Sequence, residues 1–175
     1  MPRTPRSIAA LLTALVTVLV TAAPVACSRT PPPPPTFPSP VHGKPMPDMP
    51  GYTLRGDRFD PGPLAGQVVV VKFFAKYCKP CFHTLPATQS LGEKYDDVAV
   101  VYVSLDESAA DAAQMVTQFG LTFPVLFDRS RRVAGSYRVV ELPMTFVIDK
   151  EGVVQWVGGP GQTPEHLRSA VLAYR

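Results

Sequence analysis

Residues 73–86 read FFAKYCKPCFHTLP and place two cysteines, Cys78 and Cys81, three positions apart directly after a run of valines. The chain has only three cysteines among its 175 residues. A pair with this spacing can be a structural disulfide, half of a metal site or a redox-active dithiol. The surrounding sequence has to distinguish between these three uses.

The position of the two cysteines favours the redox-active dithiol. Residues 68–74 are a run of β-branched and aromatic residues typical of a buried strand, and a helix is expected from about Cys78 to Tyr95. A thiol in the first turn of a helix faces unpaired N–H groups and the positive end of the helix dipole, which favour the nucleophilic thiolate. Cys81, one turn later and reached through Pro80, is placed to close a disulfide with Cys78.

A structural disulfide and a zinc site fit the sequence less well. The entropic gain from closing so short a ring is small, so a purely structural role has little physical motive. Zinc needs four ligands at recognisable spacing, whereas the third cysteine lies near the amino terminus and the histidines are scattered at His42, His83 and His166.

The amino-terminal part of the chain differs in composition from the rest. Residues 1–26 combine a basic start with an apolar run and small residues, which is typical of an export signal and too short for a membrane span. The residues before Cys27 are similar to a bacterial lipoprotein cleavage box, which would make Cys27 the lipidated first residue. Ordinary cleavage near Ala23 or Ala26 is the alternative. Residues 27–45 are a proline-rich linker expected to be extended.

This leader predicts a protein of the bacterial cell envelope, anchored by lipid at Cys27 and facing the periplasm or the exterior. Removal of residues 1–26 takes away Arg3 and Arg6 and lowers the formal charge from +3 to +1. No nucleic-acid partner is indicated by that charge.

From residue 46 onward, apolar runs alternate with amphipathic stretches. Strands are expected at 68–74, 98–105, 123–127, 145–148 and 153–157, and helices at 78–95, 108–119, 131–137 and 164–174. Ser108 with Asp111 is a helix-capping pair, and Thr163 caps the helix that Pro164 opens. Gly120 suits a helix end, and Gly152 suits the turn of a hairpin. The order predicts one α/β domain over residues 46–175, with a central mixed β-sheet flanked by helices.

Two motifs carry a resemblance to a known family. The segment VVVVKFFAKYCKPC, residues 68–81, resembles the strand and Cys-x-Pro-Cys active site of the thioredoxin superfamily. The segment LPMTFVID, residues 142–149, resembles its cis-proline loop and following strand. The chain is most similar to the TlpA/ResA branch, which overlaps the alkyl hydroperoxide reductase/thiol-specific antioxidant grouping. The resemblance covers about residues 46–175 and implies a thioredoxin-like fold.

The resemblance implies an extracytoplasmic thiol-disulfide oxidoreductase that uses a reversible Cys78–Cys81 disulfide and no other cofactor. Cys78 would exchange with a partner's disulfide, and Cys81 would resolve the mixed disulfide. Pro143, expected to be cis, would hold its loop beside Cys78, so that the backbone pairs with an extended partner and metal ions are kept away. The expected partners are protein dithiols or disulfides and a membrane-bound redox donor, and the domain is expected to be a monomer.

Several residues near the motif differ from the common pattern of the family. Lys72 takes the place of a buried Asp or Asn, and its ammonium either reaches the surface along the strand or lies near the second cysteine and favours thiolates. Thr84 stands where some ResA-type reductases have a glutamate. Glu141 is a candidate substitute for that glutamate, although it also fits a solvated loop residue. Lys79 adds positive charge near Cys78, which would make the disulfide more oxidising.

Two other functions are compatible with the same fold. A thiol peroxidase of the antioxidant group normally places its cysteine in a Pro-x-x-x-Thr-x-x-Cys setting, which the AKYC of residues 75–78 lacks. A copper-binding assembly factor usually has a Cys-x3-Cys spacing and a distant histidine, whereas the spacing here is Cys-x2-Cys. Met46, Met49 and Met144 are the candidate soft ligands for copper.

Overall fold

The computed structural model describes Met1 and residues 33–175. The remainder of the predicted signal segment and Cys27 lie outside the described residues. Among the helices formed by residues 33–175, none combines the length and the apolar character needed to cross a membrane.

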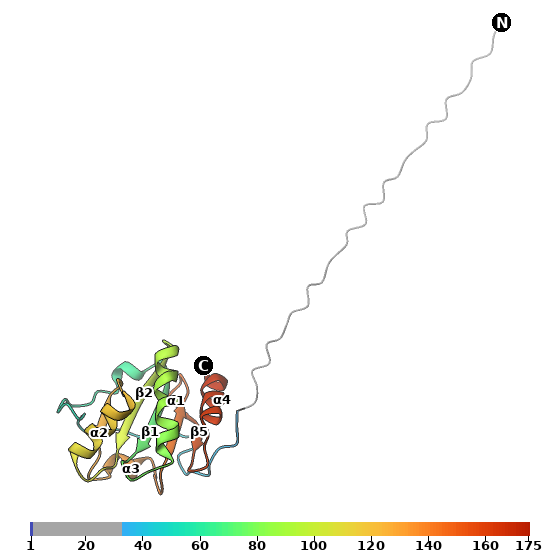
Figure 1. Cartoon of the computed structure of the whole chain (residues 1–175). Helices are drawn as coiled ribbons and strands as arrows, with labels where there is room; N and C mark the ends of the chain where they lie inside the picture. The colour runs from blue at the N-terminus through green and yellow to red at the C-terminus, as the bar shows by residue number, and fades with distance from the viewer. Residues whose placement is uncertain (2–32) are drawn as a thin grey trace.

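A five-stranded mixed sheet in the order β3-β2-β1-β4-β5 forms the centre of the structure (Figure 1). The three strands β1, β2 and β3 are parallel, and β4 is antiparallel to both β1 and β5. The strands are β1 (Val68–Phe74), β2 (Val98–Ser104), β3 (Val125–Phe127), β4 (Met144–Ile148) and β5 (Val154–Gly158). The predicted mixed sheet is confirmed. β3 begins two residues later than predicted, because Pro124 has no N–H to donate to the ladder.

Residues 33–175 also form four α-helices and one 3-10 turn, three of which connect successive strands. They are η1 (Gly62–Leu64), α1 (Cys81–Lys94), α2 (Ala109–Phe119), α3 (Arg132–Ser136) and α4 (Pro164–Tyr174). The predicted helix ends are confirmed at three places. The Ser108 side chain accepts a hydrogen bond from the backbone N–H of Asp111, Gly120 is left-handed at φ 59°, and the Thr163 side chain accepts from the N–H of His166.

Alternation along β1 divides the core into two layers. Even-numbered residues of β1, such as Val70 and Phe74, pack in the layer that contains Cys81, where α1 and α4 lie side by side on one face of the sheet (Figure 1). Odd-numbered residues such as Phe73 pack in the opposite layer with α3. Lys72 has the same parity as Val70 and Phe74, so its side chain enters the layer of Cys81.

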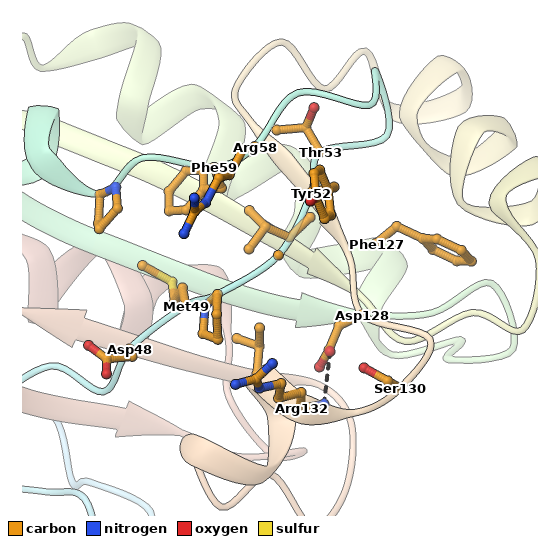
Figure 2. Close-up of a pocket in the computed structure, with 15 residues that line it drawn as sticks. Asp48, Met49, Tyr52, Thr53, Arg58, Phe59, Phe127, Asp128, Ser130 and Arg132 are labelled. Atoms are coloured by element: carbon orange, nitrogen blue, oxygen red, sulfur yellow. Dashed lines mark hydrogen bonds between the residues drawn. The ribbon is translucent and has the colours of Figure 1, made fainter.

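Residues 48–61 cover the opposite layer and the outer edge of β3. The Leu54 N–H donates to the Val125 carbonyl at 2.9 Å, and the Phe127 N–H donates to the Tyr52 carbonyl at 3.1 Å. An open groove of about 880 Å³ remains between this segment, β3 and the start of α3 (Figure 2).

Residues 35–45, here called the strap, lie against the other outer strand, β5. The Phe37 N–H donates to the Val157 carbonyl at 2.7 Å, and the Gly43 N–H donates to the Val154 carbonyl at 2.8 Å. The sequence predicts that this segment belongs to the linker. In the structure, its backbone forms hydrogen bonds with the N–H and C=O groups at the open edge of β5. The part of the chain that packs on the sheet therefore begins before residue 46, the predicted start of the domain.

Candidate active site

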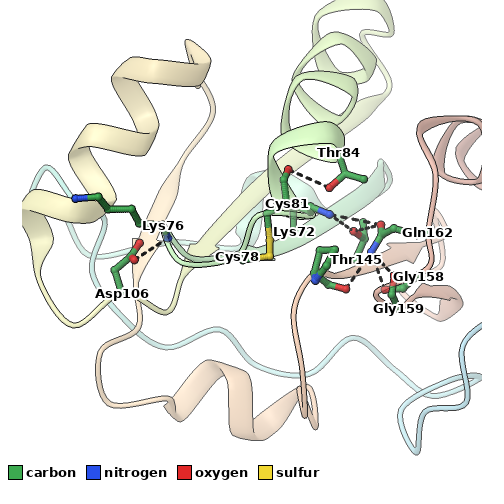
Figure 3. Close-up of a disulfide and its surroundings, with 11 residues drawn as sticks. Lys72, Lys76, Cys78, Cys81, Thr84, Asp106, Thr145, Gly158, Gly159 and Gln162 are labelled. Carbon is green, nitrogen blue, oxygen red and sulfur yellow. Dashed lines mark hydrogen bonds between the residues drawn. A yellow bond between two sulfur atoms is a disulfide. The ribbon is translucent and has the colours of Figure 1, made fainter.

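Cys78 and Cys81 form a disulfide just beyond the carboxyl end of β1 (Figure 3). Their Cα atoms are 5.4 Å apart. Cys78 keeps 5% of its surface exposed and Cys81 keeps none. The first cysteine is therefore the more accessible of the two, as predicted, although even this residue is largely buried.

The helix after the disulfide begins three residues later than the sequence predicts. α1 starts at Cys81 with Pro80 as its N-cap, whereas Cys78 lies in the preceding turn and accepts the Cys81 N–H at 3.1 Å on its carbonyl. The prediction that Cys78 occupies the first helical turn is wrong, because a proline disfavours helical geometry at the residue before it, here Lys79. Cys78 still lies beside the amino-terminal end of α1, where the helix dipole is positive.

Asp106 fixes the turn that leads into Cys78. This buried carboxylate accepts the backbone N–H of Lys76 at 2.8 Å (Figure 3). It also accepts the hydroxyl of Ser104 at 2.9 Å. Because β1 and β2 are parallel neighbours, an acid that follows β2 reaches the turn that follows β1. Asp106 was not among the predicted site residues. Its position directly after a buried strand is the signal that identifies it.

Lys72 is fully buried in the layer of the disulfide. Its Nζ donates to the Thr145 hydroxyl at 2.8 Å and to Oε1 of Gln162 at 3.4 Å (Figure 3). The alternative in which this ammonium reaches the surface is wrong, because both faces of β1 are covered. Burial away from water disfavours the charged form and lowers the pKa of Lys72 to about 7.

Gln162 connects Lys72 to the loop of Pro143. Its Oε1 also accepts the Thr145 hydroxyl at 2.6 Å, and its Nε2 donates to the Pro143 carbonyl at 3.1 Å and to two carbonyls of residues 158–159 at 3.0 Å. With both ends of the amide engaged, the orientation of the side chain is determined. No sequence motif marks Gln162, which lies between β5 and α4. The pairing of Lys72 with Thr145 across β1 and β4 is what brings these groups together.

A groove of about 390 Å³ opens beside Cys78. The groove is lined by Tyr77, Cys78, Pro80, Leu105, Arg131 and residues 139–142. The Leu142–Pro143 bond at its border is cis, as predicted. Tyr77 and Val140 are 62% and 78% exposed and present apolar surface beside the sulfur. Glu141 belongs to the same lining.

Two further predicted residues, Lys79 and Thr84, contact residues in the first turn of α1. The ammonium of Lys79, which is exposed, lies 5.2 Å from the ring centroid of Phe82. The hydroxyl of Thr84 is buried and donates to the Cys81 carbonyl at 3.2 Å. Thr84 therefore supports the first turn of α1 and offers no titrating group in place of the glutamate.

The methionines considered as copper ligands do not lie with the cysteines. Met49 and Met144 are buried in the layer of Phe73, and Met46 packs against that layer, on the opposite face of the sheet from Cys81. Within residues 33–175, no group of three or more His, Cys, Asp or Glu side chains is placed to hold a metal ion.

Burial of Lys72 predicts a pH-dependent stability of the oxidised chain. The pKa of Lys72 is about 7 in the folded state against 10.5 as its ordinary value, so the unfolded chain binds more protons between these limits. The free energy of unfolding should then rise with pH in that window, by at most about 1.4 kcal/mol per pH unit from this group. Lys72→Met removes this rise, because methionine does not titrate.

Urea unfolding of the oxidised parent and of Lys72→Met between about pH 6 and pH 9 measures the effect. The difference between the two free energies should be constant below the folded pKa and should shift in favour of the parent above it. Lys44→Met, at an exposed lysine, is the matched control and should show no such trend. A difference between parent and Lys72→Met that stays constant over the whole range would contradict the prediction.

Comparison with known proteins agrees with the geometry of the site. The model of the AhpC/TSA family matches residues 42–157. The thiol-disulfide oxidoreductase ResA of Bacillus thuringiensis is 37% identical over 128 residues, covering 71% of this chain and 73% of the relative. The thioredoxin-like protein YneN of Bacillus subtilis is 32% identical over 117 residues, covering 65% of this chain and 68% of the relative.

Solved structures share the same fold. A thiol:disulfide interchange protein, DsbE, from Chlorobium tepidum superposes with a TM-score of 0.69 at 28% identity, covering 76% of this chain and 96% of the other. A secreted disulfide oxidoreductase from Mycobacterium tuberculosis superposes with a TM-score of 0.66 at 22% identity, covering 71% and 95%. With a Cys78–Cys81 disulfide beside a cis-proline loop, the chain belongs to the AhpC/TSA family and is a thiol-disulfide oxidoreductase with a thioredoxin-like fold.

Proposed function

We propose that this chain is an exported enzyme that exchanges disulfides with extended segments of partner proteins through Cys78. The observation that carries the proposal is the difference in access between the two sulfurs. Cys78 lines the groove beside the cis-proline loop, whereas Cys81 has no exposed surface. A partner thiolate that enters the groove therefore reaches Cys78 first.

The exchange consists of two displacements that balance. A partner thiolate attacks the Cys78 sulfur, forms a mixed disulfide and releases Cys81 as a thiolate. A second partner thiolate then attacks the partner's own sulfur and releases Cys78, so that the partner gains a disulfide and the enzyme keeps two electrons and two protons as two thiols. In the reducing direction, the Cys78 thiolate attacks a partner disulfide and Cys81 resolves the mixed disulfide.

The lining of the groove suits an extended polypeptide. Exposed apolar side chains of the size of Tyr77 and Val140 mark contact surface when they border a concave site. The loop of residues 139–142 ends at the cis bond of Pro143, whose carbonyl is held by Gln162. We assign Pro143 the role of holding this loop where its backbone pairs with the partner chain.

Thiol trapping tests the exchange and its direction. In glutathione buffers, Cys78 and Cys81 should interconvert with their disulfide in a single reversible two-electron transition. A potential at or below about −200 mV is expected of a reductase and one near −120 mV of an oxidant. When treated with a disulfide-containing peptide, Cys81→Ala should accumulate a mixed disulfide, because the Cys78 thiolate displaces one peptide sulfur and the resolving thiol is gone, whereas Cys78→Ala should accumulate none. The absence of a reversible disulfide in the parent chain would sink the proposal.

Two lysines are proposed to adjust the potential of the disulfide. Lys72 lies in the layer of Cys81, so its ammonium favours the thiolates of the reduced form. Lys79 lies between the cysteines but is exposed, so solvent and salt weaken its influence. Stabilising the reduced form makes a disulfide more oxidising.

Lys72→Met should therefore make the potential more negative, by about 30 mV for each tenfold change in the exchange constant. The change should be larger below pH 7 than above it, since the pKa of Lys72 is about 7 and the ammonium is lost at higher pH. Lys79→Ala should act in the same direction, more weakly, and should lose its effect in concentrated salt. Potentials and alkylation rates of the reduced thiols that are the same in both variants and in the parent would contradict this role.

The proposed location follows from the leader sequence. Residues 1–26 have the pattern of an export signal, and one of the solved neighbours is described as secreted. We propose that Cys27 becomes the lipid-bearing first residue and that a membrane protein supplies the enzyme with electrons. Lipidation would also account for the odd number of cysteines.

Mass spectrometry of the mature protein from a bacterial host tests the anchor. The expected product begins at Cys27, carries acyl chains and partitions with membranes. Cys27→Ser should release a chain that lacks the acyl mass, while the Cys78–Cys81 disulfide still forms. A mature chain that begins at another residue, or one without acyl chains, would exclude the lipid anchor.

A further inference from the structure

The segment around α3 carries an excess of positive charge, although the described part of the chain is neutral. Three of the 17 basic residues precede residue 33 and all 14 acidic residues follow it, so residues 33–175 carry 14 of each. No acidic residue lies between Asp128 and Glu141, a stretch that spans α3 and its flanks. This stretch contains four arginines, here called the arginine cluster: Arg129, Arg131, Arg132 and Arg138.

The charges of the arginine cluster are not neutralised by residues 33–175. All four arginines are exposed, and none forms an ion pair with a carboxylate of the described residues. Asp128, their neighbour in the sequence, is directed elsewhere: it accepts the backbone N–H groups of Arg132 and Ala134 at 2.9 and 2.8 Å and so caps α3 (Figure 2). The guanidinium groups are therefore available to a partner.

One member of the arginine cluster lies on the route to the reactive sulfur. Arg131 lines the same groove as Cys78, and its guanidinium donates to the hydroxyl of Tyr77 at 3.4 Å. Arg132 and Arg58 line the larger groove beside β3 and the start of α3 (Figure 2). A polypeptide segment that reaches Cys78 through its groove passes Arg131, and Arg138 directly precedes Val139 of the same lining.

Two of these arginines occupy a backbone conformation that glycine adopts more easily. Arg131, the N-cap of α3, has φ 56°, and Arg138, just after its C-cap, has φ 55°. Positive φ is unfavourable for a residue with a Cβ atom, and such residues concentrate at functional sites. The fold alone would favour glycine at both positions. The presence of arginine there is better explained by a functional need for positive charge at the ends of α3.

We propose that the arginine cluster docks an acidic segment of the protein whose cysteines react with Cys78. The inference rests on the thiol-disulfide exchange proposed above and names its substrate class, proteins with Asp or Glu side chains close to the reacting cysteine. Guanidinium groups bind carboxylates through paired hydrogen bonds and are weakly hydrated, which favours such contacts. Complementary charge also raises the rate at which partners meet.

The test compares two cysteine peptides of equal length. They differ only in having aspartates or asparagines a few residues from the cysteine, far enough to leave its thiol unperturbed. The oxidised full chain should react with the aspartate peptide about tenfold faster at low salt, and this preference should disappear in concentrated salt. The measurement is the second-order rate of thiol-disulfide exchange by stopped-flow or quenched trapping.

Two matched double variants locate the preference. Arg131→Gly with Arg138→Gly removes two charges at positions where positive φ suits glycine, so the thermal unfolding midpoint should stay close to that of the parent. This variant should lose most of the tenfold preference. Lys44→Gln with Arg168→Gln removes two exposed charges outside the cluster and should keep the preference.

Each other result overturns the inference. Equal rates for the two peptides in the parent chain would show that the cluster does not select acidic partners. If the glycine double variant kept the preference for the aspartate peptide, or if the Lys44→Gln with Arg168→Gln control lost it equally, the preference would come from charges outside the arginine cluster. Binding to phosphatidylglycerol vesicles without a peptide preference would assign the cluster to a lipid surface. If neither peptide reacts and dithiothreitol does not reduce the disulfide, the proposed function fails as well.

Discussion

The geometry around the disulfide depends on the buried ammonium of Lys72. Within residues 33–175 this charge has no carboxylate partner and is held by two neutral oxygens, those of Thr145 and Gln162. A buried charged group that loses a hydrogen-bond partner destabilises a fold by about 1–3 kcal/mol or more. The hydrogen bonds of this ammonium therefore hold three elements together: β1, which leads into the cysteines, β4, which follows the cis-proline, and the loop before α4.

Polar contacts also hold the groove in position from both of its sides. On one side, Asp106 holds the backbone of Lys76 in the turn before Cys78. On the other side, Gln162 holds the carbonyl of Pro143. Both contacts act on backbone atoms, so the distance between the sulfur and the loop that faces it is set by the main chain. Tyr77 and other exposed side chains of the groove can then vary without moving the reacting atom.

The sequence predicted the elements that depend on local pattern. Apolar runs located the strands, and Ser108 and Thr163 located two helix starts. The cis bond of Pro143 was expected from the family resemblance of residues 142–149. Features that depend on contacts between distant segments were not predicted. The position of the Lys72 ammonium was left open between two alternatives, because a lysine on a strand reaches water only if one face of the sheet is open.

The strap and Gln162 illustrate the same limit. Proline-rich composition predicted a linker for residues 27–45, yet a proline carbonyl can still accept a hydrogen bond, and the Trp156 indole donates to that of Pro35 at 3.2 Å. Gln162 belongs to no motif and acquires its role only when β1, β4 and its own loop are packed together. The late start of α1 is the local error, where Pro80 restricts the residue before it.

Docking of the strap on β5 shortens the part of the chain that can act as a tether. If Cys27 carries the lipid, only the residues from 27 to Pro35 separate the membrane from the first contact with the domain, a span of about 28 Å when fully extended. A tether that ran to residue 46 would reach about 65 Å. The enzyme would then work in a thin layer next to the bilayer, where it meets membrane-bound partners often and distant soluble proteins rarely.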